Sequence, residues 1–226
     1  NACLIVVMVS LMPIALVVAK RIDVPPAQPA ASREGKVADT LARPGVWRVL
    51  VTSSLVVTGI DMYQFYLPIY AHSIELSASV TGVVLAMYSA AAFVVRLIMP
   101  RMLDIWNEER VLAYSFCLGA ATLVLLPYLN NGFVLAAASF VLGLGMGCCQ
   151  PITMMLTFSR SAEGRSGEAL GLRLTINHLS RLIGPVAFGA IGSAFGIFAV
   201  FWTNATLLAS GALVTHGHGA RRTARD

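Results

Sequence analysis

The sequence is poor in charge: only 12% of its 226 residues are Asp, Glu, Lys or Arg, about half the fraction usual in soluble domains. Hydrophobic residues make up 57% of the chain, and the mean hydropathy is +0.76. This composition excludes a disordered chain and argues against a soluble globular domain. It predicts a protein surrounded mostly by lipid, with room for about seven membrane-spanning helices of ~20 residues.

The patterns of metal sites and catalytic centres are also lacking. The cysteines Cys3, Cys117, Cys148 and Cys149 lie in apolar stretches, without the spacing of metal ligands, and we interpret them as packing residues. The sequence contains no His-Glu-x-x-His and no Gly-x-Ser-x-Gly. We therefore predict no metal, no cofactor and no catalytic residues, and the protein is not predicted to be an enzyme.

Long apolar stretches determine the predicted fold. Seven of them, about 18 to 26 residues long, are sufficient to cross the hydrocarbon of a bilayer, and most lack the polar face of a soluble amphipathic helix. The predicted fold class is all-α, a polytopic transmembrane helical bundle. The stretches are Ala2–Ala19, Val46–Tyr70, Val80–Met99, Val111–Leu129, Phe133–Phe158, Leu170–Phe195 and Ile197–Val214.

Proline and charge separate the first stretch from the others. Residues 20–48 contain Pro25, Pro26, Pro29 and Pro44 among several charged residues, a composition typical of a solvated linker. The predicted organisation is a transmembrane helix at 1–19, a cytoplasmic loop at 20–48, a six-helix bundle at 49–215 and a cytoplasmic tail at 216–226.

The basic residues predict the orientation. If residues 20–48 are cytoplasmic, all but three of the 16 Lys and Arg fall in cytoplasmic segments, and the opposite loops carry none. The exceptions, Arg96, Arg173 and Arg181, lie inside spans. We predict an integral, multi-pass protein of the plasma (inner) membrane with a cytoplasmic C-terminus. The net charge of +5 is then a topological signal and does not indicate nucleic-acid binding.

Glycine and proline form a more specific pattern in the second half. The fifth predicted span carries Gly143-Leu-Gly-Met-Gly147 followed by Gln150-Pro151, and the sixth carries Gly184-Pro185-Val-Ala-Phe-Gly189. This pattern resembles the tenth and eleventh helices of the major facilitator superfamily. Residues 46–214 look like the C-terminal six-helix bundle of that family, and residues 2–48 look like its sixth helix and central loop.

The resemblance implies a fold of twelve spans in two bundles, so the chain looks like slightly more than half of a transporter. The expected partners are the lipid bilayer, a small-molecule substrate and a missing N-terminal bundle of the same protein. The implied activity is secondary active transport of a small organic solute by alternating access. The loop at 100–110 keeps the family's aspartate as Asp104 but lacks its glycine and inner arginine. The predicted gating or hinge residues are Asp104, Gly143, Gly147, Pro151, Gly184, Pro185 and Gly189.

Ionisable residues inside the membrane are costly and usually functional. Asp61 and Arg181 lie at similar depths in their spans, counted at 1.5 Å per residue, and are predicted to face each other near the midplane. Asp61 has two interpretations, a proton-coupling carboxylate or a permanent structural ion pair. For Arg181 the alternatives are a substrate anion or Asp61 itself.

Other polar residues surround this pair. Arg173, Asn177 and Arg181 share a helix face because they are four residues apart, and the two arginines form a cationic stripe that favours an anionic or zwitterionic substrate. The full set of candidates for substrate or coupling-ion binding is Asp61, Tyr63, Gln64, Gln150, Arg173, Asn177, His178 and Arg181.

Three alternatives remain open at this stage: a seven-span receptor, an intramembrane enzyme, and a remnant half-bundle that does not transport. A transporter bundle predicts that residues 46–129 and 133–214 form two inverted three-helix repeats. A receptor makes no such prediction.

Overall fold

The computed structural model describes residues 44–161 and 165–222, and every regular element in these ranges is a helix. The predicted first span and the predicted loop up to residue 43 lie outside the described residues. The elements are α3 (Pro44–Ser73), α4 (Ala78–Ile105), α5 (Glu108–Leu125), the short 3-10 helix η1 (Leu126–Tyr128), α6 (Gly132–Met146), α7 (Cys149–Arg160), α8 (Ser166–Phe195) and α9 (Ile197–Arg222).

The first and last described helices extend beyond the predicted boundaries of the bundle. Helix α3 begins at Pro44, inside the predicted loop, and proline suits a first helical position because its missing N–H would have no helical partner there. Helix α9 continues to Arg222, through most of the predicted tail. Short connections at Asn131 and Gly196 separate the helices on either side of them. The Asn131 side chain caps α6, and Gly196 ends α8 with a φ of +84°.

The fifth predicted span forms one membrane-crossing stretch, Gly132–Arg160, but its helix is interrupted at Gly147 and Cys148, which separate α6 from α7. An unbroken helix would bond the amide of residue 151 to the carbonyl of Gly147, and Pro151 has no such hydrogen. Arg96 of α4 donates from its Nε to this carbonyl at 3.0 Å. A side chain from the neighbouring helix therefore replaces the backbone bond that the proline removes.

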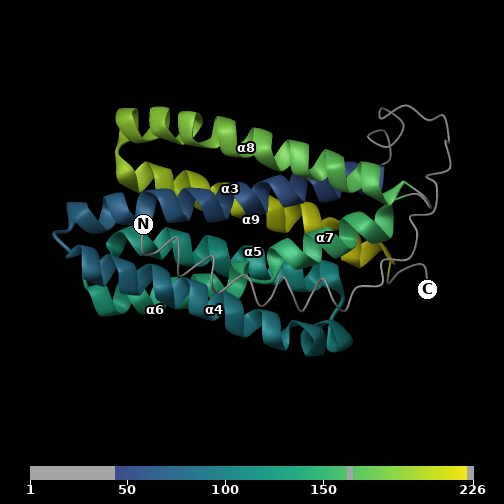
Figure 1. Cartoon of the computed structure of the whole chain (residues 1–226), viewed down its shortest axis with the longest axis horizontal. Helices are drawn as coiled ribbons and strands as arrows, with labels where there is room; N and C mark the ends of the chain where they lie inside the picture. Colours follow the sequence, from purple (N-terminus) through teal and green to yellow (C-terminus); the bar gives the residue numbers. More distant parts are fainter. Residues whose placement is uncertain (1–43, 162–164, 223–226) are drawn as a thin grey trace, which may run out of the picture. The chain divides into compact units, whose positions relative to one another are not determined.

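Five described stretches are long and apolar enough to cross a membrane. Helix α8, the sixth predicted span, is not among them although it has 30 residues, because polar side chains such as Asn177, His178 and Arg181 lower its hydropathy. It nevertheless packs along α3 and α9 in the bundle (Figure 1). The five stretches are Gly45–Ser73, Ala78–Ile105, Glu108–Tyr128, Gly132–Arg160 and Ile197–Thr215.

The helix contacts have an internal twofold pattern. One half consists of α3, α4 and α5, and the other of α6–α7, α8 and α9. The contact between α4 and α6 corresponds to the contact between α8 and α3 (Figure 1). In the same way, the contact between α5 and α6 corresponds to the contact between α9 and α3. Helices at equivalent positions in the two halves also contact each other: α5 contacts α9, and α3 contacts α7. Exchanging the halves leaves the pattern unchanged, as the predicted pair of inverted repeats requires.

Gly143 and Gly147 bring α6 into backbone contact with α4. A Cβ atom added at Gly143 would clash with the carbonyl oxygen of Tyr88, and one at Gly147 would lie 2.5 Å from the Cα of Ala92. No side chain fits at either position. The small residues predicted for helix packing therefore allow the two backbones to approach this closely.

We expect Gly143→Ala to destabilise the bundle by about 1–3 kcal/mol, because α4 must move away to accommodate the methyl group. The midpoint of thermal unfolding in detergent measures the effect. Gly82→Ala, on α4, is the matched control, since a Cβ at Gly82 has no atom within 4 Å. If both variants unfold at the same temperature, backbone contact at Gly143 does not hold the two helices together.

Candidate functional site

Polar side chains connect the middle of α3 to the middle of α8. The Asn177 amide and the Ser53 hydroxyl exchange hydrogen bonds of 3.1 and 3.2 Å, and both side chains are buried. The Ser54 and Ser180 hydroxyls lie 2.5 Å apart. Together with the ion pair described next, these contacts form the α3–α8 polar interface, which consists of Ser53, Ser54, Asp61, Asn177, Ser180 and Arg181.

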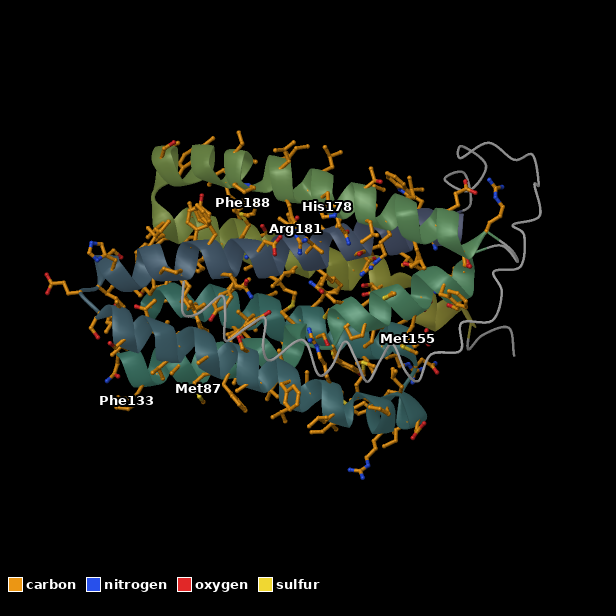
Figure 2. All side chains as sticks on the ribbon, in the orientation of Figure 1. Met87, Phe133, Met155, His178, Arg181 and Phe188 are labelled. Atoms are coloured by element: carbon orange, nitrogen blue, oxygen red, sulfur yellow. The ribbon has the colours of Figure 1, made fainter. Side chains whose placement is uncertain are left out.

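Asp61 and Arg181 form an ion pair in this interface. The Arg181 Nε donates to the Asp61 Oδ2 at 2.8 Å, which confirms that the two residues face each other. Figure 2 shows Arg181 on the side of α8 that faces α3. The two side chains are 47% and 27% exposed. An exposed ion pair halfway along a membrane span is costly against lipid, so this side of the bundle suits contact with water or with protein.

Arg173 contacts a different helix from Arg181. Its Nη2 donates to the Thr153 hydroxyl at 3.0 Å and to the Gln150 carbonyl at 3.4 Å, both on α7. The predicted shared face of Arg173, Asn177 and Arg181 is confirmed, because all three point toward α3 or α7. The predicted cationic stripe is not present, since Asp61 neutralises Arg181 and Arg173 binds α7.

The other predicted site residues are dispersed. Tyr63 is only 1% exposed and packs against Tyr88, with ring centroids 5.0 Å apart. It therefore lies in the core. Gln64 and His178 are exposed on their helices, and Figure 2 places His178 near Arg181 on α8. Of the predicted polar neighbours of Asp61, the structure brings only Arg181 into contact with it.

The predicted hinge residues also divide into groups. Added Cβ atoms at Gly184 and Gly189 would have no neighbour closer than 3.4 Å, so neither glycine is needed for close packing, unlike Gly143 and Gly147. Pro185 lies inside α8 without ending it. Asp104 is exposed in the last turn of α4.

The sequence interpretation missed two ion pairs, of which one is between Arg165 and Glu168 at the beginning of α8 and the other connects two helices. Glu109, which was not among the candidate residues, pairs with Arg160. The pair connects the beginning of α5 to the end of α7. Opposite charges at helix ends on the same side of the membrane were the available signal, but sequence alone does not show that these ends are adjacent.

Comparison with known proteins identifies the family. Residues 49–217 match the model of the Major Facilitator Superfamily. The chain belongs to this superfamily. The family consists of integral, multi-pass membrane proteins that are transporters and not enzymes, as predicted, so membership removes the receptor and intramembrane-enzyme alternatives.

Individual relatives of this chain are distant. The chain is 27% identical to the uncharacterized MFS-type transporter YuxJ of Bacillus subtilis (strain 168) over 189 residues, which are 80% of the chain and 47% of the relative. It is 25% identical to the multidrug resistance protein MdtL of Escherichia coli (strain SMS-3-5 / SECEC) over 149 residues, 66% of the chain and 38% of the relative. The chain therefore spans less than half the length of either relative.

We expect Asn177→Ala to destabilise the helical bundle by about 0.5–1.7 kcal/mol, the range for interhelical hydrogen bonds in membranes. The change removes both hydrogen bonds to Ser53 and leaves a buried hydroxyl without its partner. His178→Ala is the control, because His178 is the next residue on α8 and is exposed. Equal unfolding temperatures for the two variants would contradict a stabilising role for the α3–α8 polar interface.

Proposed function

We propose that this protein carries out secondary active transport of a small organic solute by alternating access, with the exposed side of α3 and α8 along the solute pathway. The observation that carries the proposal is the partly exposed ion pair of Asp61 and Arg181, midway along two long helices. Charged side chains at this depth are expected to face a water-filled cavity rather than lipid. The membership in a transporter family supports the same interpretation.

We further propose that Asp61 is the proton-coupling residue. A proton on its carboxylate removes the negative charge that holds Arg181, so the ion pair is lost while the contacts at Ser53 and Ser54 remain. The exposed part of Asp61 provides access for the proton. Protonation would thus weaken one of three connections between α3 and α8 and favour a different spacing of these helices.

Transport is proposed as an activity of a longer protein. The matched relatives are more than twice as long as the segments they share with this chain, and alternating access requires a second structural unit against which this bundle moves. We propose that this unit is an N-terminal bundle of the same protein. The name of MdtL refers to multidrug resistance, which supports an organic solute.

The same proposal includes an orientation. The ends of α4 and α7 and the beginnings of α3, α5 and α8 carry arginines, whereas the turns at residues 74–77 and 129–131 carry none. Under the positive-inside rule the arginine-bearing ends face the cytoplasm. The protein is then a plasma (inner) membrane protein with a cytoplasmic C-terminus.

We expect Asp61→Asn, made in the transport-competent protein, to abolish the dependence of transport on a pH gradient, because an amide cannot exchange the proton. Solute flux into proteoliposomes, measured with and without the gradient, tests this. Glu75→Gln is the matched control, since Glu75 is an exposed carboxylate in a turn outside the spans.

Two results would contradict the proposal. An unchanged pH response in Asp61→Asn would remove proton coupling through this residue. A correctly folded parent protein that moves no solute would instead favour a remnant without transport activity.

Reporter fusions test the orientation. Green fluorescent protein, which becomes fluorescent in the cytoplasm, should fluoresce when fused after residue 226. Alkaline phosphatase, which needs an oxidising compartment, should be active when fused after residue 77, between α3 and α4. The reverse pattern would invert the proposed topology.

A further inference from the structure

A second polar region lies apart from the ion pair of Asp61 and Arg181. It is a pocket of about 380 Å³ among α4, α7 and α8. Two of its lining side chains are arginines, and none is acidic. We call it the two-arginine pocket, lined by Arg96, Met99, Gln150, Pro151, Met154 and Arg173.

Arg173 is the buried charge of this pocket. The residue is only 8% exposed, and its two hydrogen bonds, to the Thr153 hydroxyl and the Gln150 carbonyl, both use Nη2. Its buried Nε has no partner. Both partners of Nη2 are neutral oxygens, so the guanidinium charge is not compensated by them. A buried cation with an unsatisfied N–H is costly in this setting.

Arg96 brings a second cation to the same pocket. Its Nε donates a hydrogen bond to the Gly147 carbonyl at 3.0 Å. This bond holds the guanidinium beside the interruption between α6 and α7. The ion pairs found in the described part of the chain involve Glu109, Glu168 and Asp61, each with another arginine. Neither Arg96 nor Arg173 is paired with a carboxylate among the described residues.

We infer that the two-arginine pocket binds an oxyanion, a carboxylate or a phosphate group, between Arg96 and Arg173. Guanidinium groups bind such anions through paired N–H donors. The side chains of Met99 and Met154 give the pocket an apolar part as well, which suits the hydrocarbon portion of an organic acid.

The oxyanion has two potential sources. It belongs either to the transported solute or to an acidic side chain of the longer protein. The first source rests on the proposed function, since it makes the solute an organic anion, while the second does not. Both require the same chemistry at Arg96 and Arg173.

Benzoate is a suitable probe, and benzamide is its neutral counterpart of the same shape. Titration calorimetry on the 226-residue chain in detergent should show benzoate binding at least tenfold tighter than benzamide. Arg173→Gln should weaken benzoate binding at least tenfold, and Arg101→Gln, which lies outside the pocket at the end of α4, should change it less than twofold. Equal binding of the two probes, or parent-like benzoate binding by Arg173→Gln, would overturn the inference.

Met154→Glu provides a second test if Arg173→Gln does not fold. Met154 is 52% exposed and lines the pocket, so a glutamate here places a carboxylate beside the arginines. We expect this variant to lose benzoate binding and to unfold at a higher temperature than the parent. A less stable variant that still binds benzoate would count against the inference.

The same titration on the transport-competent protein distinguishes the two sources. If the pocket is a solute site, the transport-competent protein still binds benzoate, and Arg173→Gln still weakens this binding. A pocket filled by an acidic side chain of that protein binds no benzoate, although the 226-residue chain does. These binding measurements are independent of the flux measurements on Asp61→Asn, so either proposal can fail while the other stands.

Discussion

Hydrocarbon offers no hydrogen bonds, so a polar group in a membrane span is costly unless it finds a partner within the protein or in water. The contact between Arg96 and the Gly147 carbonyl shows this constraint directly. Pro151 removes the backbone donor for that carbonyl, and the arginine of a neighbouring helix replaces it. The pair of Asn177 and Ser53 satisfies the same requirement between α8 and α3. The helical architecture, the interruption between α6 and α7, and the α3–α8 polar interface all follow from this one constraint.

Sequence was informative where depth along a helix decides the outcome. Asp61 and Arg181 could be paired because a fixed rise per residue places both near the same level. Gly147 and Pro151 were predicted as hinge residues, but a full break between α6 and α7 was not predicted, because apolar residues continue on both sides of Gly147. Sequence also left open whether Tyr63 is a packing residue or part of the candidate site, for a related reason. A span surrounded by lipid or protein on every side lacks the polar–apolar contrast that identifies the inward face of a soluble helix.

Arg173 shows a second limit of sequence interpretation. Its four-residue spacing to Asn177 and Arg181 correctly indicated a common helix face. The neighbour on that face changes along α8, however, from α7 near the beginning of the helix to α3 near its middle. Spacing determines the direction of a side chain but not which helix lies opposite it at a given height. Two arginines on one face can therefore belong to separate sites.

The two helix pairs related by the internal repeat are joined by different kinds of contact. Helices α4 and α6 touch through backbone and methyl groups at Gly143 and Gly147, contacts that neither water nor a proton can replace. Helices α8 and α3 are also joined by hydroxyl, amide and carboxylate groups, and water can replace each of these as a hydrogen-bond partner. The bundle thus has a stiff side and a compliant side. A helix tilt that widens or narrows the bundle is therefore opposed least at α8, whereas α4 and α6 move together as a rigid pair.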